Sequence, residues 1–401
     1  MKNDKKPKIR FKGFDDDWEQ RKWVDSVDIS TEMVDPTSSE YADMPHIAPG
    51  NIESFTGRIL DNVKMVKEEQ LISGKFRFRP DDVVYGKINP QLGKYFYASV
   101  DGLTSADAYV FKGKNGTTQK FLFSLLQTNE FFKYSVSVSK RSGMPKINRD
   151  ELNAYRFFSP NEEEQDKIGD LLLGIGHLIT LHQRKCDKLQ KIKKSMLEKM
   201  FPQNESKKPE IRFKGFNVDW EQRKLGEVSE SYSGGTPSVG NKSYYVGSIP
   251  FIRSAEINSE STELFLTEEG LTNSSARMVS KGDILYALYG ATSGETGRSR
   301  INGAINQAIL AILPHDGYDS EFLMQWLRKS KQNITDIYLQ GGQGNLSGTI
   351  VKALEVNFPS LAEQRQIGNY FQSLDNLITL HQRELEKMKY IKKSMLEKMF
   401  V

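Results

Sequence analysis

The sequence predicts an α/β (α+β) protein made by pseudo-two-fold internal duplication, with two α/β modules separated by a long antiparallel two-helix coiled coil. Residues 7–22 recur at 209–224 with 13 of 16 positions identical, and residues 178–201 recur at 377–400 with 18 of 24 identical. The two stretches between these repeats are about equally long and barely resemble each other. A scaffold has therefore been duplicated while its insert has been varied.

Composition sets limits on the class of protein. The 401 residues divide into two repeat units, each long enough for an ordinary core, and 37% are hydrophobic while 27% are charged. No apolar run approaches the roughly 20 residues of a membrane span, and the charged N-terminus is unlike a secretory signal. The single cysteine, Cys186, excludes a disulfide framework or a cysteine-rich zinc site and is typical of a reducing cytosol. A net charge of +4 permits nucleic-acid binding without by itself indicating it.

The first insert, residues 24–158, mixes strands and helices. Residues 82–85, 94–97 and 108–111 are strand-like, with Gly and Pro between them. Residues 120–133 are predicted to form one helix, because Phe121, Leu125 and Leu126 mark a single face. This combination predicts an α/β or α+β module.

A long helix is predicted after each insert. Asn161 is a plausible N-cap ahead of three glutamates, and no proline follows until Pro202. A helix of roughly 40 residues would be about 60 Å long. The near-heptad spacing predicts a packed seam, and the most economical partner for each helix is the other copy. Because the first helix leads into the second insert and the second helix starts where that insert ends, the connectivity favours an antiparallel pair with one insert at each end. The expected seam is Ile175, Ile179, His182, Cys186, Leu189, Ile192 and Met196 in the first helix and Leu374, Ile378, His381, Leu385, Met388, Ile391 and Met395 in the second.

Polar residues on these helices allow more than one interpretation. His182 and His381 occupy equivalent seam positions and are expected to pack or hydrogen-bond there, while Cys186 is expected to be a small core residue. Neither histidine has metal-ligand spacing with another His or Cys, so we predict no metal site. The lysine-rich faces, which include residues 193–194 and 392–393, fit a solvated flank better than a direct contact with DNA, although such lysines could add salt-sensitive attraction.

No catalytic residue is predicted. The sequence lacks an Asn/Asp-Pro-Pro-aromatic motif and a Gly-rich cofactor loop, and the phosphate-loop lookalike at 235–242 has Asn241 between its glycine and lysine. Asp81 near Lys87 could indicate a nuclease. The Asp-apolar-apolar-Tyr pattern recurs at residues 283–286, however, and is better interpreted as a turn into a buried strand.

The order of these segments resembles the specificity subunits of type I restriction-modification systems over nearly the whole chain. The leaders carry the resemblance at residues 9–11 and 18–19 and in their copies at 211–213 and 220–221. Further matching segments are 82–90 and 145–147 in the first insert, 234–237, 249–251, 282–285 and 305–307 in the second, and 164–169 and 363–368 at the helix starts.

This resemblance implies a non-catalytic, cytoplasmic, DNA-reading adaptor. Residues 1–158 would hold the N-terminal leader and first target recognition domain, and 159–203 the central helix. Residues 204–358 would hold the linker, repeated leader and second recognition domain, and 359–401 the C-terminal helix. Each domain would read one half of an asymmetric bipartite double-stranded DNA target. The helices would set the spacer and dock two adenine-DNA methyltransferase (M) subunits.

The resemblance also implies how cofactors are distributed. This chain would bind none. S-adenosylmethionine, ATP and Mg would be on the M subunits and on the restriction/translocase (R) subunits, and the chain would not contact a membrane.

Loops rich in polar and basic residues are the candidate DNA contacts. Arg suits guanine and Asn or Gln suits adenine, although each residue could equally belong to an ordinary polar loop. The candidates are Lys87, Asn89, Gln91, Lys94, Lys140, Arg141, Ser142 and Lys146 in the first insert and Tyr289, Thr292, Ser293, Arg298, Arg300, Gln340, Gln343 and Asn345 in the second.

Aromatic residues are retained in both leaders, where Phe11, Phe14 and Trp18 have matching copies. They could stack on bases. Identical residues cannot explain two different specificities, so we expect them to join module to helix. For the whole chain, two other classes stay open: a coiled-coil scaffold linking two protein-binding modules without a DNA role, and a self-contained enzyme.

Overall fold

A computed structural model describes residues 5–140, 143–203, 206–339 and 345–401. The chain forms two compact units. Unit 1 comprises Met1–Lys185 with His381–Val401, and unit 2 comprises Cys186–Leu380. Each unit therefore contains one module together with part of each long helix.

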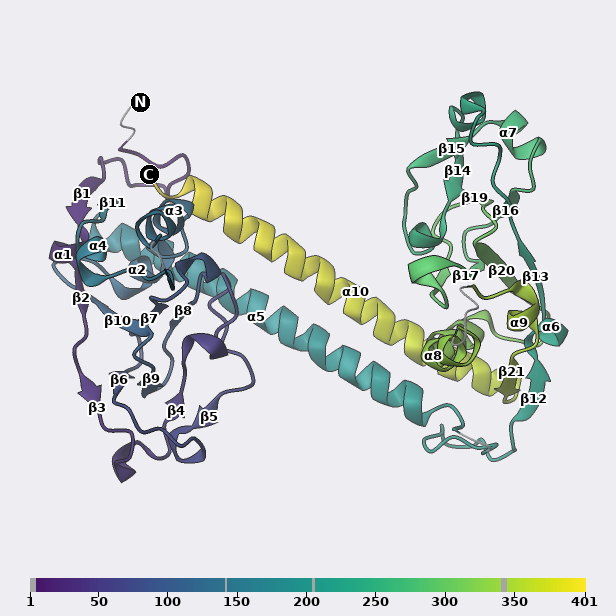
Figure 1. Cartoon of the computed structure of the whole chain (residues 1–401), viewed down its shortest axis with the longest axis horizontal. Coiled ribbons are helices and arrows are strands. Elements are labelled where there is room, and N and C mark those ends of the chain that lie inside the picture. The colour runs from purple at the N-terminus through teal and green to yellow at the C-terminus, as the bar shows by residue number, and fades with distance from the viewer. Residues whose placement is uncertain (1–4, 141–142, 204–205, 340–344) are drawn as a thin grey trace. The chain divides into compact units, whose positions relative to one another are not determined.

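The two long helices are α5 (Glu162–Lys199) and α10 (Leu361–Lys398), each of 38 residues (Figure 1). They run antiparallel within each unit. In unit 1 the Nδ1 atoms of His182 and His381 lie 3.1 Å apart, and a Cβ atom on Gly176 would lie 3.5 Å from Lys392 Nζ. In unit 2 Cys186 Sγ lies 4.0 Å from Ile378 O, and Lys193 Nζ lies 2.6 Å from Asp375 Oδ1. Within each unit, residue numbers thus fall along α10 as they rise along α5, as the sequence predicted.

The residues of the predicted seam lie on the inner faces of the two helices. All fourteen of its residues are buried or half-buried, and Cys186 is only 2% exposed. Four leucines on the outer face are exposed instead: Leu178 and Leu181 in α5, and Leu377 and Leu380 in α10. The near-heptad spacing therefore separated the packed face of each helix from its open face.

The module of unit 1 contains a four-stranded and a five-stranded sheet. The four-stranded antiparallel sheet has the order β2 (Val27–Ile29), β10 (Ala108–Gly113), β7 (Val83–Gly86) and β8 (Tyr95–Tyr97). The five-stranded sheet has the order β3 (Met33–Val34), β6 (Lys75–Phe78), β9 (Gly102–Thr104), β4 (Pro45–His46) and β5 (Lys64–Met65). The helices are α1 (Trp23–Ser26), α2 (Gln119–Leu125), α3 (Asn129–Val138) and α4 (Arg149–Asn153).

The central strands are buried on both faces because their side chains alternate between two cores. Along β7, Val83 and Tyr85 face the core shared with the helices, whereas Val84 joins a smaller core on the opposite side of the strand. Phe111 and Val110 of β10 divide in the same way. This period of two is why 82–85 and 108–111 read as continuous apolar strands.

Unit 2 repeats the four-stranded sheet. Its order is β13 (Ser229–Ser233), β20 (Ile309–Pro314), β17 (Ile284–Ala287) and β18 (Thr296–Arg298). A second four-stranded sheet has the order β15 (Leu264–Leu266), β14 (Ile249–Ile252), β19 (Gly303–Ile305) and β16 (Arg277–Val279). The helices are α6 (Leu225–Val228), α7 (Glu268–Thr272), α8 (Ser320–Tyr338) and α9 (Gly348–Lys352).

The single helix predicted at 120–133 is wrong. The chain forms α2 and then α3, with a break at residues 126–128. Thr128 caps α3, since its hydroxyl oxygen accepts a hydrogen bond from the Phe131 N–H at 3.3 Å. A threonine cap followed by Asn129 and Glu130 begins a new helix, whereas unit 2 has the unbroken α8 at this place.

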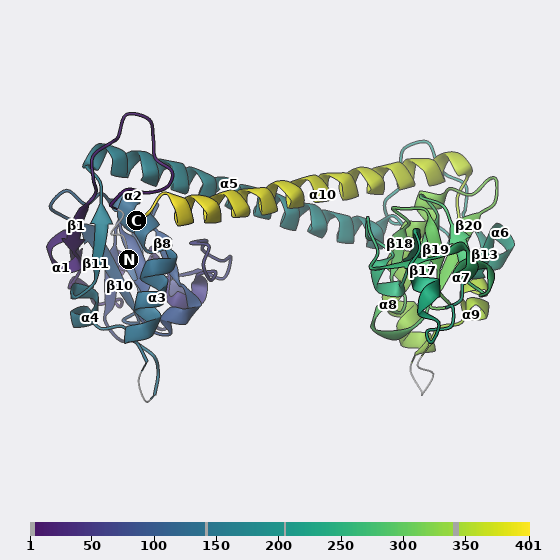
Figure 2. The same ribbon diagram turned by 90° about the horizontal axis from the view of Figure 1, so that it is seen from above.

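The leaders join module to helix, as expected. In unit 1, β1 (Glu19–Lys22) pairs with β11 (Arg156–Ser159), the strand that leads into α5, and Figure 2 shows the two side by side. Trp18 is 2% exposed and packs edge-on against Phe121 of α2 and Phe400 after α10. In unit 2, β12 (Glu221–Lys224) pairs with β21 (Glu355–Phe358) in the same way.

Candidate nucleic-acid interface

Two candidate loops meet in unit 1. Ile88 and Lys146 form an antiparallel bridge, in which Ile147 N–H donates to Lys87 O at 3.0 Å and Asn89 N–H donates to Pro145 O at 2.8 Å. The bridge extends the end of β7. It places Lys87 and Asn89 beside Lys146, although almost sixty residues separate them in sequence.

Unit 2 builds the same junction from different side chains. Tyr289 and Asn345 form the bridge, and Leu346 N–H donates to Leu288 O at 3.0 Å. The backbone arrangement is repeated, whereas the bridging residues change from Ile and Lys to Tyr and Asn. A constant frame therefore presents unlike side chains in the two modules.

The candidates of unit 1 differ in exposure. Gln91, Lys140 and Lys146 are exposed, and Asn89 is half-buried with a left-handed backbone (φ 51°). Lys94 is half-buried and donates its ammonium N–H to the Ile52 carbonyl. Arg141 and Ser142 lie outside the described residues.

Lys87 has charged neighbours, the basic residues Lys146 and Arg149 and the acid Asp107. Its Nζ atom lies 4.9 Å from the centroid of the Tyr109 ring, a cation–π arrangement. Burial lowers the pKa of its ammonium, and the neighbouring charge of Lys146 lowers it further. Two ammonium groups close together would gain from a phosphate between them.

The candidates of unit 2 also divide. Asn345 and Arg300 are exposed, and Tyr289 and Thr292 are half-buried. Ser293 is 6% exposed, and its hydroxyl donates to Gly290 O at 2.8 Å within the turn. Gln340 and Gln343 lie outside the described residues.

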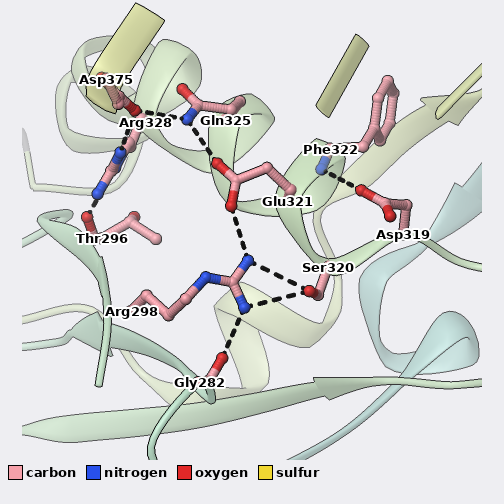
Figure 3. Close-up of polar contacts among 10 residues, drawn as sticks. All are labelled: Gly282, Thr296, Arg298, Asp319, Ser320, Glu321, Phe322, Gln325, Arg328 and Asp375. Carbon is pink, nitrogen blue, oxygen red and sulfur yellow. Dashed lines mark hydrogen bonds and ion pairs between the residues drawn. The ribbon is translucent and has the colours of Figure 1, made fainter. Parts of the chain in front are cut away.

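Arg298 is engaged inside its own module. Its guanidinium donates to Gly282 O at 2.6 Å, to Glu321 Oε2 at 2.8 Å and to the Ser320 hydroxyl at 3.2 Å (Figure 3). These bonds tie β18 to the start of α8. The sequence indicated an arginine in a polar loop, but it could not show that these donors are already used.

Asp375 of α10 extends this chain of contacts to the helix pair. Its Oδ2 atom accepts from Gln325 Nε2 at 2.9 Å and from Arg328 Nη1 at 3.1 Å (Figure 3). Its Oδ1 atom lies 2.6 Å from Lys193 Nζ. Arg328 also donates to Thr296 O at 3.0 Å. We call these five residues the Asp375 network. It fixes α8 and β18 of the second module against both long helices.

The Asp375 network was missed by sequence reasoning, although one clue was available. The helix copies are nearly identical, yet at the equivalent offset of 199 residues α5 has Gly176 where α10 has Asp375. Lys193 and Lys392 also proved to face a module. Lys193 is half-buried in its ion pair and Lys392 is buried, whereas Lys194 and Lys393 are exposed.

A further arginine escaped notice because nothing in its local sequence marks it. Arg277 in β16 is exposed, and its guanidinium lies 3.9 Å from the centroid of the Tyr232 ring. Such stacking holds an arginine in a defined orientation on the surface.

Comparison with known proteins decides the family. A family model described as "Type I restriction modification DNA specificity domain" matches residues 15–191 and again residues 217–390. The chain belongs to this type I DNA specificity family. The two matches correspond to the two copies of the duplication. Specificity subunits of type I systems are non-catalytic, so the match favours the DNA-reading interpretation over a protein-binding scaffold or a self-contained enzyme.

Individual type I specificity subunits are similar to this chain over different shares of its length. The chain is 24% identical to the putative type I restriction enzyme MjaX specificity subunit of Methanocaldococcus jannaschii, over 95% of this chain and 92% of that one. It is 32% identical to the type I restriction enzyme EcoDI specificity subunit of Escherichia coli, over 38% of this chain and 33% of that one. The chain thus spans about a third of the second relative.

The fold of this chain is also similar to that of a solved structure. The crystal structure of the type I restriction-modification system S subunit from M. genitalium superposes with a TM-score of 0.72, over 99% of both chains and at 14% identity. In the part of the chain that the structure describes, no three His, Cys, Asp or Glu side chains gather in a way that could hold a metal ion. Over the same residues, every helix is too short or too polar to span a bilayer.

Proposed function

We propose that this chain is the DNA-specificity subunit of a type I restriction-modification complex, with each module reading one half of an asymmetric bipartite DNA target. The observation that carries the proposal is the repeated junction after the central strand of each module. Lys146 and Asn345 occupy this junction in units 1 and 2 and are both exposed. Phosphate contacts fix register and base contacts specify sequence, so unlike side chains on a common frame would read unlike half-targets.

Direct readers should be the exposed candidates. Lys146, Gln91 and Lys140 in the first module and Asn345 and Arg300 in the second have side chains open to a ligand. The two Nη groups of Arg298 and the hydroxyl of Ser293 donate hydrogen bonds within the second module. We expect those two to support the reading surface and not to contact bases.

The long helices would dock two M subunits and set the spacer between the half-targets. Leu178 and Leu181 in unit 1 are 42% and 48% exposed, and their copies Leu377 and Leu380 in unit 2 are 44% and 52% exposed. Exposed leucines that recur in both copies suit two identical partners. S-adenosylmethionine would belong to the M subunits, and ATP and Mg to the R subunits. Because the target is cellular DNA, we place the chain in the cytoplasm.

Methylation mapping tests the proposal. The chain is expressed with its M subunit in a host that lacks adenine methylation, and modified sites are located across the genome. We expect one split motif. Replacing residues 24–158 with the corresponding module of another specificity subunit should change one half of that motif and preserve the other. A change in both halves, or unchanged methylation, would contradict the modular assignment.

The spacer is tested separately. Two added helical turns, about seven residues, are inserted into both α5 and α10. The two halves of the motif should stay the same while the unread interval between them lengthens. If a half-target changes and the interval does not, the helices do not set the spacer.

A further inference from the structure

Unit 1 contains a cavity of about 620 Å³ between the first module and the C-terminal part of α10. Phe55, Phe132 and Ile179 form apolar walls, and Lys389, Lys392 and Lys393 contribute ammonium groups. Cavities of this size that are largely apolar and have a few polar groups are typical of sites for small organic ligands.

Lys392 is the unusual member of this lining. It is only 8% exposed, and no described residue accepts a hydrogen bond from its ammonium group. Glu397 also lines the cavity, but it is exposed and forms no ion pair with Lys392 among the described residues. A buried charge without a partner is costly, and burial lowers the pKa of Lys392 to about 8.

The equivalent lysine in unit 2 has a partner. Lys193, which is 199 residues before Lys392, pairs with Asp375 at 2.6 Å. The position equivalent to Asp375 is Gly176 in α5, where a Cβ atom would lie 3.5 Å from Lys392 Nζ. Unit 1 therefore has the equivalent lysine without the carboxylate.

A second polar group at the cavity also lacks a partner. Gln127 lines the cavity, and its buried Oε1 atom receives no hydrogen bond from the described residues. It follows α2 at the place where α8 continues to Arg328, which donates to Asp375 in unit 2. Two participants of the Asp375 network, the acid and the arginine, are thus replaced in unit 1 by groups that leave Lys392 unpaired.

We propose that this cavity, the Lys392 cavity, binds an organic carboxylate whose anionic group pairs with Lys392 and whose apolar body lies against Phe55, Phe132 and Ile179. An ammonium donates three hydrogen bonds and a carboxylate accepts them, so this ligand supplies what Asp375 supplies in unit 2. Lys393 adds positive charge at the cavity and favours an anion, whereas Lys389 is paired with Glu386 at 2.9 Å. The same chemistry can come from a small molecule or from an Asp or Glu side chain of a bound protein.

Calorimetric titration of the full chain with 4-phenylbutyrate at pH 7 tests the site, with the neutral 4-phenylbutanamide as the matched ligand. We expect saturable 1:1 binding of the acid and at least tenfold weaker binding of the amide. Lys392→Met should weaken binding of the acid by a similar factor, whereas Lys194→Met, at an exposed lysine, should leave it unchanged. Undetectable binding of the acid, or equal binding by Lys392→Met, overturns the proposal.

Gly176→Asp provides a second test that keeps the lysine. It adds a carboxylate next to Lys392 at a position where the added Cβ meets only that lysine. The variant should fold, as judged by circular dichroism, and should lose binding of 4-phenylbutyrate at least tenfold. Unchanged binding by a folded Gly176→Asp chain also overturns the proposal.

Acylation of Lys392, followed by mass spectrometry, identifies the source of the carboxylate. The reaction is run on the free chain, with 4-phenylbutyrate and with the M subunit. If 4-phenylbutyrate and the M subunit each protect Lys392 from acylation, and the M subunit displaces 4-phenylbutyrate, the site is assigned to a carboxylate of a bound protein. Protection by the probe alone, in the free chain and in the complex, assigns it to a small molecule. Because the free chain needs neither DNA nor methylation here, failure leaves the proposed function untouched.

Discussion

Arg10 in the first leader donates two hydrogen bonds to the carboxylate of Glu164 in the first turn of α5, at 2.7 and 2.8 Å. Arg212 and Glu363 repeat this pair in unit 2 at 2.6 and 2.7 Å. Glu164 has no exposed side-chain surface, and hydrogen bonding to it raises the pKa of Arg10. The duplicated sequence thus preserves a buried ion pair that anchors each leader to the helix that follows its module.

Glu164→Ala should destabilise unit 1 by roughly 3 kcal/mol, because it leaves the Arg10 guanidinium partly buried without its partner. Amide hydrogen exchange in urea resolves the two units, which need not unfold together. Amides of unit 1 should exchange faster and those of unit 2 should not change. Glu163→Ala, which removes an exposed i,i+4 pair with Lys167, is the control and should cost less than about 0.5 kcal/mol. Equal effects of the two substitutions would contradict a structural role for the pair.

Asp375→Asn should loosen the attachment of the second module. It removes the negative charge that Lys193 and Arg328 share, and because Asp375 is 30% exposed we expect a loss of roughly 1–2 kcal/mol. Hydrogen exchange should accelerate around Thr296 and in α8 while unit 1 is unaffected. Asp316→Asn, at an exposed loop position, should change neither region. Unchanged protection of α8 in Asp375→Asn would show that the network does not hold the module.

Lys146→Ala and Asn345→Ala should weaken DNA binding in different ways. If Lys146 contacts phosphate, its removal should lower affinity for all sequences alike and reduce the slope of log affinity against log salt by about 1. Asn345→Ala should cost about 1–3 kcal/mol and relax selectivity at one base pair of the second half-target. Anisotropy titrations of the complex with M subunits, over a range of salt and single-base variants, distinguish the two. Identical behaviour of the variants would argue against separate roles.

Stability should respond to pH through Lys392. Its folded pKa of about 8 lies below the usual 10.5, so at pH below 8 the folded state bears the full cost of the buried charge. Between pH 8 and 10.5 the unfolded chain binds more protons, and the free energy of unfolding rises with pH. The rise, up to about 3 kcal/mol, should be absent in Lys392→Met. Denaturant titrations of the full chain at pH 7, 9 and 10.5, followed through the amides of unit 1, measure this rise in the free energy of unfolding. Lys389, Lys393 and Glu397 line the same cavity and remain in both chains, so the difference isolates Lys392.

The elements that repeat in the sequence were predictable, because positions that are identical in both copies mark the residues of the shared structural frame. The helix seam, the buried Trp18 and the turn that leads from Asp82 into β7 follow from periodicity and duplication. Asp82 indeed accepts a hydrogen bond from the Arg79 N–H at 2.8 Å, which closes that turn. At these positions the local sequence pattern indicates the same buried face or turn that the tertiary packing requires.

What was not predictable depends on which face of an element meets a distant one. Periodicity shows that Lys193 and Lys392 lie outside the seam, but it cannot show that a module covers this side of the helices. For the same reason Arg298 looked available for base contact, although Glu321 takes up its guanidinium. The break between α2 and α3 was missed because the prediction rested on the apolar face of residues 120–126 and did not consider that Thr128 could cap a second helix.

The contact between His182 and His381 makes two equivalent residues of the repeat differ from each other. The two residues occupy equivalent positions of a duplicated helix, and their Nδ1 atoms are within hydrogen-bonding distance at 3.1 Å. A neutral imidazole has one protonated and one bare nitrogen, so one Nδ1 must hold the proton and the other must accept it. Desolvation and the charge of Lys185 lower the pKa of His381, which favours its neutral form. Two residues that are identical in sequence thereby take unlike roles in one hydrogen bond, one as donor and one as acceptor, and the local symmetry of the helix pair ends at a single hydrogen atom.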